Sequence, residues 1–457
     1  MRSKLMVSGL AWVMAWGGVM VAEAWGDDAR TVNWPSFRGE RASGVAEGVQ
    51  LVRSFDVASG EGVRWETEIP GLGHSSPVVW EDRIFVTTAI SLDAEEQLRT
   101  GLFGDIEPAE EDGEFIWRVY CLDKQTGEVL WYDDAHQGSP GAARHPKATH
   151  ANPTAATDGE RVVVFFGSEG LYAYDMDGQL EWEVDFGVLD VGFFQVPEAQ
   201  WGFASSPVLH DGLVIVQVDT QDEQFVAALD ASDGSTVWRT ERDDVPTWST
   251  PTVAEHDGQW QVVVNGWRHI GGYDLSDGQP LWWLEGGGDL PVPTPVVAEG
   301  KVFITNSHGG QSPLYAVELD ARGDVTPQRG GALPEGLAWW EPNNGAYMQT
   351  PLVLDGYVYS ARDNGVLSVY DARSGERVMR ERIGGGGMGF TASPVAADGH
   401  IYFAAEDGQV FVFRAVGDGT VELVAESEAG AGVLATPAIS EDVLLIRTTE
   451  GVVAIGG

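Results

Sequence analysis

The sequence predicts an all-β fold, an eight-bladed β-propeller of four-stranded antiparallel blades. Three observations predict it: a proline motif that occurs eight times, a constant order of short strands and turns in each repeat, and chain ends that complete one blade together. The 457-residue chain contains 59 glycines and 22 prolines, a composition that suits frequent turns. A closed array grows by adding repeats, so this length does not require several domains.

The repeated motif consists of one or two small residues, a proline and a β-rich pair, as in SSPVV, STPTV and ASPVA. Successive prolines are 76, 54, 44, 44, 56, 43 and 43 residues apart, which is a base period of 43 to 44 with three insertions. Periods of about 40 to 50 residues that are built from strands are typical of propeller blades. The motif prolines are Pro77, Pro153, Pro207, Pro251, Pro295, Pro351, Pro394 and Pro437.

A typical repeat continues with a short turn, a second β-branched strand, a third strand, a tight turn and a fourth strand, which carries tryptophan in most repeats. The clearest hairpins are YCLDKQTGEVLW, AALDASDGSTVW and GYDLSDGQPLWW. Asp and Gly suit their turns because both tolerate the left-handed backbone that tight turns require. We expect the repeat tryptophans to be mostly buried at the seams between blades. They are Trp65, Trp131, Trp182, Trp238 and Trp282 or Trp283.

The two ends of the chain predict how the ring closes. The last repeat, ATPAISEDVLLIRTTEGVVAIGG, stops after its third strand, whereas VRWETEI precedes the first motif as an unpaired fourth strand. We expect the segment 61 to 69 to pair with the strand that ends near Ile455, so that an N-terminal strand completes the last blade. Residues 61–457 then form a single propeller, preceded by an N-terminal extension over residues 25–60.

Residues 1–24 have the pattern of a secretory signal peptide. Arg2 and Lys4 precede an apolar run from residue 5 to residue 21, and the small-x-small tripeptide at 22 to 24 is a cleavage site. We therefore expect a cleaved signal and a periplasmic or secreted mature chain. A retained anchor is the alternative, because the run is only slightly shorter than the ~18 apolar residues of a membrane span. No transmembrane span is expected in the mature chain.

Charge and cysteine content exclude several classes of partner and linkage. The chain has 70 acidic and 27 basic residues and a formal net charge of −43. Such a field repels nucleic acid and anionic lipid, so neither is expected as a partner. Cys121 is the only cysteine, which excludes an intrachain disulfide and a lipid-modified cysteine at the signal cleavage site.

The motif spacing is specific enough to indicate a family. Asp123, Gly127 and Trp131 show an Asp-x-x-x-Gly-x-x-x-Trp spacing that returns at 230 to 238, together with SPVV strands and the opening NWPSFRGERASG. In these features the chain resembles the pyrroloquinoline-quinone-like propeller repeat family, over roughly residues 31 to 457. The segments RVMRERI and VELVAES, in the sixth and seventh repeats, lack the tryptophan. The resemblance implies that the tryptophan packs one blade on the next, so it indicates a fold and no particular cofactor.

Antiparallel blades place the second-third and fourth-first loops on one face of the ring. The long segments 91 to 115, 132 to 149 and 184 to 203 belong to this face, where binding usually resides. The alternative is that loop aromatics only fill the channel and seal the seams. We expect a ligand-binding rim made of His74, His150, Trp201, Trp248, Trp267, Arg268, His269, Asn343, Asn344, Tyr347, Met388 and Phe390.

Metal and phosphate chemistry receive little support. His74 and His150 each stand three residues before a motif proline, so the two imidazoles are candidates for a shared metal. No carboxylate or third histidine occupies the same register, and we expect no metal site. The glycine-rich segment 384 to 390 precedes a strand, whereas a phosphate cradle precedes a helix. No catalytic residue can be assigned.

Two functions follow. The first is an extracytoplasmic binding or scaffold module, without a cofactor, for a protein, peptide or saccharide partner. The second, implied by the family resemblance, is a quinoprotein dehydrogenase that oxidises an alcohol or sugar with pyrroloquinoline quinone and calcium. Family enzymes hold the quinone between a tryptophan and a ring of two adjacent cysteines, and a chain with Cys121 alone cannot form that ring. Trp248 is the candidate for the quinone floor in this second function.

Overall fold

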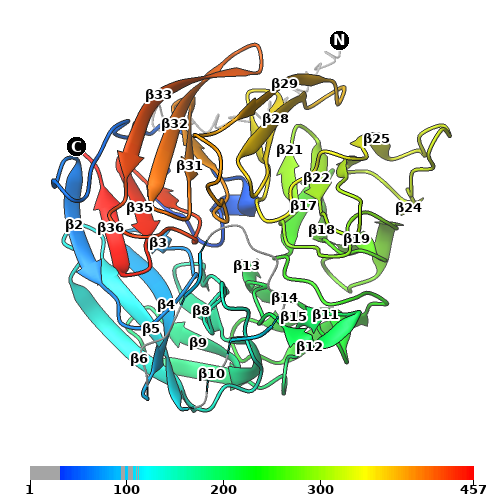
Figure 1. Cartoon of the computed structure of the whole chain (residues 1–457). Helices are drawn as coiled ribbons and strands as arrows, with labels where there is room; N and C mark the ends of the chain where they lie inside the picture. The colour runs from blue at the N-terminus through cyan, green and yellow to red at the C-terminus, as the bar shows by residue number, and fades with distance from the viewer. Residues whose placement is uncertain (1–30, 94–97, 101–106, 110, 112) are drawn as a thin grey trace, which may run out of the picture.

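The computed structural model describes residues 31–93, 98–100, 107–109, 111 and 113–457. Within them, eight antiparallel sheets are arranged as a ring around a central axis (Figure 1), which confirms the predicted eight-bladed propeller. The predicted signal peptide lies outside the described residues. Each blade begins with a short inner strand that follows the motif proline, because the proline lacks a backbone N–H donor and suits a strand start.

The blades are numbered here in chain order, and their strands run from the axis outward. Blade 1 contains β3 (Val78–Trp80), β4 (Arg83–Ser91), β5 (Phe115–Asp123) and β6 (Val129–Gly138); blade 2 contains β7 (Ala156–Thr157), β8 (Arg161–Phe165), β9 (Leu171–Asp175) and β10 (Leu180–Val184). Blade 3 contains β13 (Val208–His210), β14 (Leu213–Asp219), β15 (Gln224–Asp230) and β16 (Thr236–Glu241); blade 4 contains β17 (Thr252–His256), β18 (Gln259–Val264), β19 (Ile270–Asp274) and β20 (Pro280–Leu284).

Blades 5 to 8 follow the same plan. Blade 5 contains β21 (Val296–Ala298), β22 (Lys301–Thr305), β23 (Leu314–Glu318) and β25 (Leu337–Glu341); blade 6 contains β26 (Leu352–Leu354), β27 (Tyr357–Ala361), β28 (Val366–Asp371) and β29 (Arg377–Arg382). Blade 7 contains β30 (Val395–Ala397), β31 (His400–Ala404), β32 (Gln409–Val416) and β33 (Thr420–Glu428); blade 8 contains β34 (Ala438–Ser440), β35 (Val443–Arg447), β36 (Gly451–Ile455) and β2 (Val63–Glu68).

Blade 8 joins the two ends of the chain. The N-terminal strand β2 pairs antiparallel with β36, with Val63 opposite Ile455 and Trp65 opposite Ala454. This pairing confirms the predicted closure. It covers the edge that β36 would otherwise expose, and it ties the ends of the propeller to each other through backbone hydrogen bonds.

The repeat tryptophans link neighbouring blades. The indole N–H of Trp65 donates to the carbonyl of Lys124 in blade 1, at 2.9 Å, and that of Trp238 donates to Leu275 in blade 4, at 2.8 Å. Trp65, Trp182, Trp238 and Trp282 are buried, as predicted, whereas Trp131 and Trp283 are half-buried. Each linking indole donates to a carbonyl near the third-fourth turn of the next blade. The other links of this kind are Trp131 to Met176, Trp182 to Ala231 and Trp339 to Ala372.

The seam between blades 4 and 5 departs from this pattern. Trp282 donates to the side chain of Gln261 within its own blade, at 2.8 Å, and Gln261 in turn donates to the carbonyl of Leu319 in blade 5, at 3.0 Å. The long third-fourth connection of blade 5 also returns to blade 4, where β24 (Gly323–Asp324) pairs parallel with β20. A side-chain amide thus replaces the direct indole contact at this seam.

The segment before β2 closes one end of the channel. Trp34 forms an isolated bridge with Val79, and β1 (Val45–Ala46) pairs parallel with β30, so the segment crosses from blade 1 to blade 7. Between them lies the short 3-10 helix η1 (Glu40–Ala42), visible in blue at the centre of the ring in Figure 1. The N-terminal segment contacts the ends of the inner strands that lead into the first-second turns. These turns lie on the face opposite the long loops.

Candidate functional site

Aromatic side chains from three parts of the chain meet on the loop-rich face. The fourth-first loop between blades 2 and 3 contains a small hairpin, β11 (Gly192–Phe193) and β12 (Val196–Gln200). The ring of Phe194 lies 5.1 Å from that of Trp267 in blade 4, and the ring of Phe193 lies 5.4 Å from that of His308 in blade 5. These contacts between fourth-first and second-third loops agree with the predicted placement of both loop types on one face.

Trp201 connects this hairpin to the interior. Its ring stacks on Phe193 at a centroid distance of 5.9 Å and contacts Trp248 at 5.5 Å. Trp248 is only 8% exposed, and its indole N–H donates to the carbonyl of Gly202 at 2.9 Å. Trp248 therefore packs beneath the loops, while Trp201 and Trp267 are half-buried above it. We call Phe193, Phe194, Trp201, Trp248, Trp267 and His308 the aromatic cluster.

A buried ionic network fixes the loop that carries Trp267. The guanidinium of Arg242 lies 3.0 Å from carboxylate oxygens of both Asp219 and Asp244, and none of these three side chains is exposed. Asp244 also accepts hydrogen bonds from the backbone N–H groups of residues 267, 268 and 269. A carboxylate that is bonded to consecutive amides and to a buried cation holds the loop in one conformation.

The buried network also shifts the pKa values of Arg242 and His269. Burial disfavours the charge on Arg242, but Asp219, Tyr273 and Asp244 outweigh it and hold the pKa of Arg242 above its usual range. Burial and the nearby Arg242 lower the pKa of His269 to about 4. The Nδ1 atom of His269 lies 3.0 Å from the Tyr273 hydroxyl. The imidazole is therefore neutral at neutral pH and takes part in hydrogen bonding rather than in charge pairing.

His74 and His150 have separate partners. The Nε2 atom of His74 lies 2.9 Å from the carbonyl of Lys147, whereas Nε2 of His150 lies 2.9 Å from a carboxylate oxygen of Glu111. Burial lowers the pKa of His74 to about 4, and the cations Arg144, Arg447 and Lys147 act in the same direction. Among the residues with a described position, no group of three or more His, Cys, Asp or Glu side chains could hold a metal ion.

The polar contacts around Lys147 lie in positions that the sequence did not indicate. Its ammonium lies 2.5 Å from Glu406, a side chain that is 2% exposed, and Glu406 accepts a 2.7 Å hydrogen bond from Thr391. Sequence reasoning also missed the network of Arg242. Neither group carries a motif, because each joins residues from different blades whose spacing in the chain follows no local rule.

The remaining rim candidates have different environments. Tyr347 is partly buried and packs against the hydrophobic core that contains Trp248. Asn343 is exposed. The backbone carbonyl of Asn343 accepts a 2.7 Å hydrogen bond from Arg362. Phe390 is 2% exposed within the core between blades 6 and 7, where Met388 packs partly buried. Asn344 is half-buried and Arg268 is exposed.

Comparison with known proteins gives a consistent family. The family model of outer membrane protein assembly factor BamB matches residues 22–188, 117–329 and 334–456. BamB of Yersinia pestis is 23% identical over 276 residues, which are 58% of this chain and 52% of that protein, so the chain spans about half the length of this curated relative.

Solved structures agree on the fold. BamB from Moraxella catarrhalis covers 80% of this chain with 98% of its own, at a TM-score of 0.52 and 16% identity. Quinohemoprotein alcohol dehydrogenase from Comamonas testosteroni covers 94% of this chain with 81% of its own, at a TM-score of 0.59 and 13% identity. In the described part of the chain, no helix has the length and hydrophobicity of a membrane span. With family-model matches that cover nearly all of the propeller, the chain belongs to the BamB family of pyrroloquinoline-quinone-like repeat propellers.

Proposed function

We propose that this protein is an extracytoplasmic binding or scaffold module that captures a protein, peptide or saccharide partner on its loop-rich face. The observation that carries the proposal is the aromatic cluster, which gathers side chains from blades 2 to 5 into continuous ring contacts. Rigid aromatic side chains provide a large contact area with little loss of conformational entropy on binding.

An exposed arginine adjoins the aromatic cluster, and aromatic and arginine side chains together are typical of recognition surfaces. The guanidinium of Arg268 is exposed and lies 5.6 Å from the centre of the Trp267 ring. Its ion pair with Asp243 joins two side chains that are 48% and 96% exposed, so solvent screens the pair. Arg268 and Trp267 can therefore contact a partner without first breaking a strong internal interaction.

The family relationship favours a protein partner within this proposal. The relatives are described as factors in outer membrane protein assembly, which is a protein-binding role outside the cytoplasm. The signal-like pattern of residues 1–24 supports the same location for this chain. Protein or peptide capture is therefore the first activity to test, followed by saccharide binding.

The quinoprotein dehydrogenase is less well supported, because the residues present do not fit the cofactor. Trp248, the candidate floor for the quinone, is buried against Trp201 and donates its N–H to Gly202. Cys121 is buried within β5, and the sequence contains no second cysteine to form the opposing ring. We therefore derive no redox step through pyrroloquinoline quinone.

The test is capture of partners from an extracytoplasmic extract and a glycan array by the purified protein, with quantification of any identified pair. Trp267→Ala should weaken binding at least about tenfold, the effect of losing a central aromatic anchor. Trp80→Ala is the matched control, since Trp80 is a half-buried tryptophan next to a first-second turn on the opposite face.

The competing explanation is attraction between the acidic surface and a basic partner. Exposed charges are screened within ~10 Å at 0.1 M salt, so that mode of binding should collapse as salt is added. Binding that survives 0.5 M salt and depends on Trp267 supports the proposal. Binding that disappears with salt and ignores Trp267→Ala contradicts it.

A further inference from the structure

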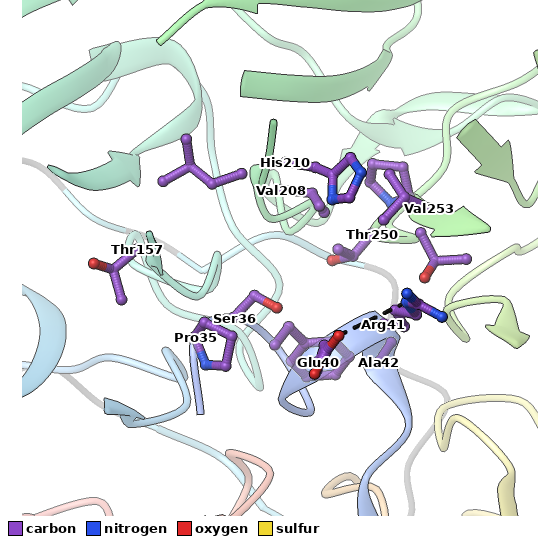
Figure 2. Close-up of a pocket in the computed structure, with 14 residues that line it drawn as sticks. Pro35, Ser36, Glu40, Arg41, Ala42, Thr157, Val208, His210, Thr250 and Val253 are labelled. Atoms are coloured by element: carbon purple, nitrogen blue, oxygen red, sulfur yellow. Dashed lines mark ion pairs between the residues drawn. The ribbon is translucent and has the colours of Figure 1, made fainter. Parts of the chain in front are cut away.

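A second site lies at the opposite end of the channel from the aromatic cluster. A pocket of about 80 Å³ opens between the N-terminal segment and the inner strands of blades 2, 3 and 4 (Figure 2). At ~10–15 Å³ per water, it has room for roughly five to eight water molecules, or a ligand with a similar number of heavy atoms. Its walls are formed by residues 35–37, 40–42, 157, 208–210 and 250–253.

One side of the pocket carries a weakly compensated cation. Arg41 pairs with Glu40 at 3.8 Å, a long contact to a carboxylate that is 81% exposed (Figure 2). The Arg41 guanidinium also lies 5.3 Å from the centre of the Trp260 ring, which restrains it without neutralising its charge. Arg41 therefore presents a positive charge at the pocket that its carboxylate partner compensates only weakly.

Two further polar side chains line the same pocket. Thr252 is 1% exposed and its hydroxyl lies within the wall, out of reach of a ligand in the cavity. The ring of His210 lies 4.1 Å from that of Trp260, and burial lowers its pKa, so it lines the pocket in the neutral form.

The rest of the lining is apolar. Phe37, Val208, Leu209, Pro251 and Val253 complete the walls. A ligand that satisfies the pocket therefore combines a negatively charged head with a short hydrocarbon body. A phosphate or sulfate ion lacks such a body, whereas a small carboxylic acid has it.

The pocket is preformed by a constrained segment of backbone. Arg38, Arg41 and Ala42 have positive φ values of 63°, 52° and 54°. Side chains other than glycine rarely adopt this conformation, and it persists only where surrounding contacts enforce it. The fully buried Arg38 supplies such contacts, because its guanidinium donates to the carbonyls of Pro394 at 2.6 Å and Pro351 at 3.1 Å.

We infer that this pocket binds a small organic carboxylate, whose head pairs with Arg41. The hydrocarbon body packs against Phe37, Val208 and Val253. This site is separate from the proposed partner-binding face, since the two lie at opposite ends of the channel. Loss of one is therefore expected to leave the other intact.

Ligand-observed NMR with propionate tests this inference on the purified full-length mature protein. Propionamide is the matched probe, because it has nearly the same size but no charge. We expect propionate to bind and propionamide to fail as a competitor. Arg41→Gln should weaken propionate binding severalfold, because the Arg41 side chain is 43% exposed and solvent screens its charge.

Arg329→Gln removes the same charge from an exposed loop outside the pocket and should leave propionate binding unchanged. Thermal melting establishes that each variant is folded, and Arg41→Lys, which keeps the charge, should retain part of the affinity if Arg41→Gln does not fold. The inference is overturned if propionamide competes as well as propionate, if propionate does not bind, or if Arg41→Gln binds propionate normally.

Discussion

Replacing Gly278 by alanine should loosen the seam between blades 3 and 4. Gly278 lies in the third-fourth turn of blade 4 with φ +71°, directly beneath the ring of Trp238 from blade 3. A Cβ atom at this position would lie 2.5 Å from Cε3 of Trp238, closer than any relaxed contact. Trp238 cannot simply move away, because it is 8% exposed and donates its N–H to Leu275 at 2.8 Å.

Gly258 provides a matched control for the backbone. It also has a positive φ, +82°, but no atom lies within 4 Å of a Cβ built there. Alanine in the left-handed region costs about 1–2 kcal/mol at either position. Overpacking adds about 1–3 kcal/mol at Gly278 only. We therefore expect Gly278→Ala to destabilise the protein by about 2–5 kcal/mol and Gly258→Ala by about 1–2 kcal/mol.

Equilibrium urea unfolding followed by circular dichroism measures both changes as shifts of the midpoint. A third variant isolates the ring: Trp238→Ala should itself cost about 3–5 kcal/mol through lost packing. In that background the Cβ still lies 2.7 Å from Thr240 Oγ1, so Gly278→Ala should cost less than in the parent chain but more than Gly258→Ala does. The proposed packing is refuted if Gly278→Ala and Gly258→Ala lower the free energy of unfolding equally in the chain that retains Trp238.

Three other outcomes are expected. Arg242→Met leaves Asp219 and Asp244 buried without their cation and should destabilise the protein by about 3–5 kcal/mol in thermal or urea unfolding; a neutral effect would mean that the network is not ionised. His269 is neutral when folded down to about pH 4, whereas its unfolded pKa is near 6.5. The unfolded state therefore binds more protons between these pH values, and the free energy of unfolding falls as pH drops through this window, by at most about 1.4 kcal/mol per pH unit. His269→Gln should reduce this pH dependence relative to the parent protein. An unchanged pH dependence would contradict the lowered pKa of His269. Arg38→Met removes the contacts to the carbonyls of blades 6 and 7, so amide hydrogen exchange should accelerate at residues 38–46 while the blade strands remain protected.

The two proposed sites make different demands on the fold. The aromatic cluster lies on loops of unequal length, and the buried Arg242 network fixes one of them. The carboxylate pocket instead lies between the inner strands and a strained N-terminal segment. Both sites depend on ring closure through β2 and β36, because closure holds the inner strands in a fixed circle.

The blade count, the closure by residues 61 to 69 and the face that carries the long loops could all be predicted from the sequence. These features depend on local patterns that repeat: a proline before an inner strand, an Asp and Gly turn, and a tryptophan that follows at constant spacing. The missing fourth strand of the last repeat was visible for the same reason, since only VRWETEI could replace it.

Tertiary structure alone decided which rim candidates meet and which are exposed. Trp248 and Phe390 belong to loops by pattern, yet both are buried, because neighbouring blades cover them. Arg38 is also placed by tertiary contacts. Its guanidinium donates to carbonyls 313 and 356 residues away, and these hydrogen bonds hold the N-terminal segment over the channel and shape the pocket. Such contacts join residues whose separation follows no period, so they are set by how the blades pack around the axis.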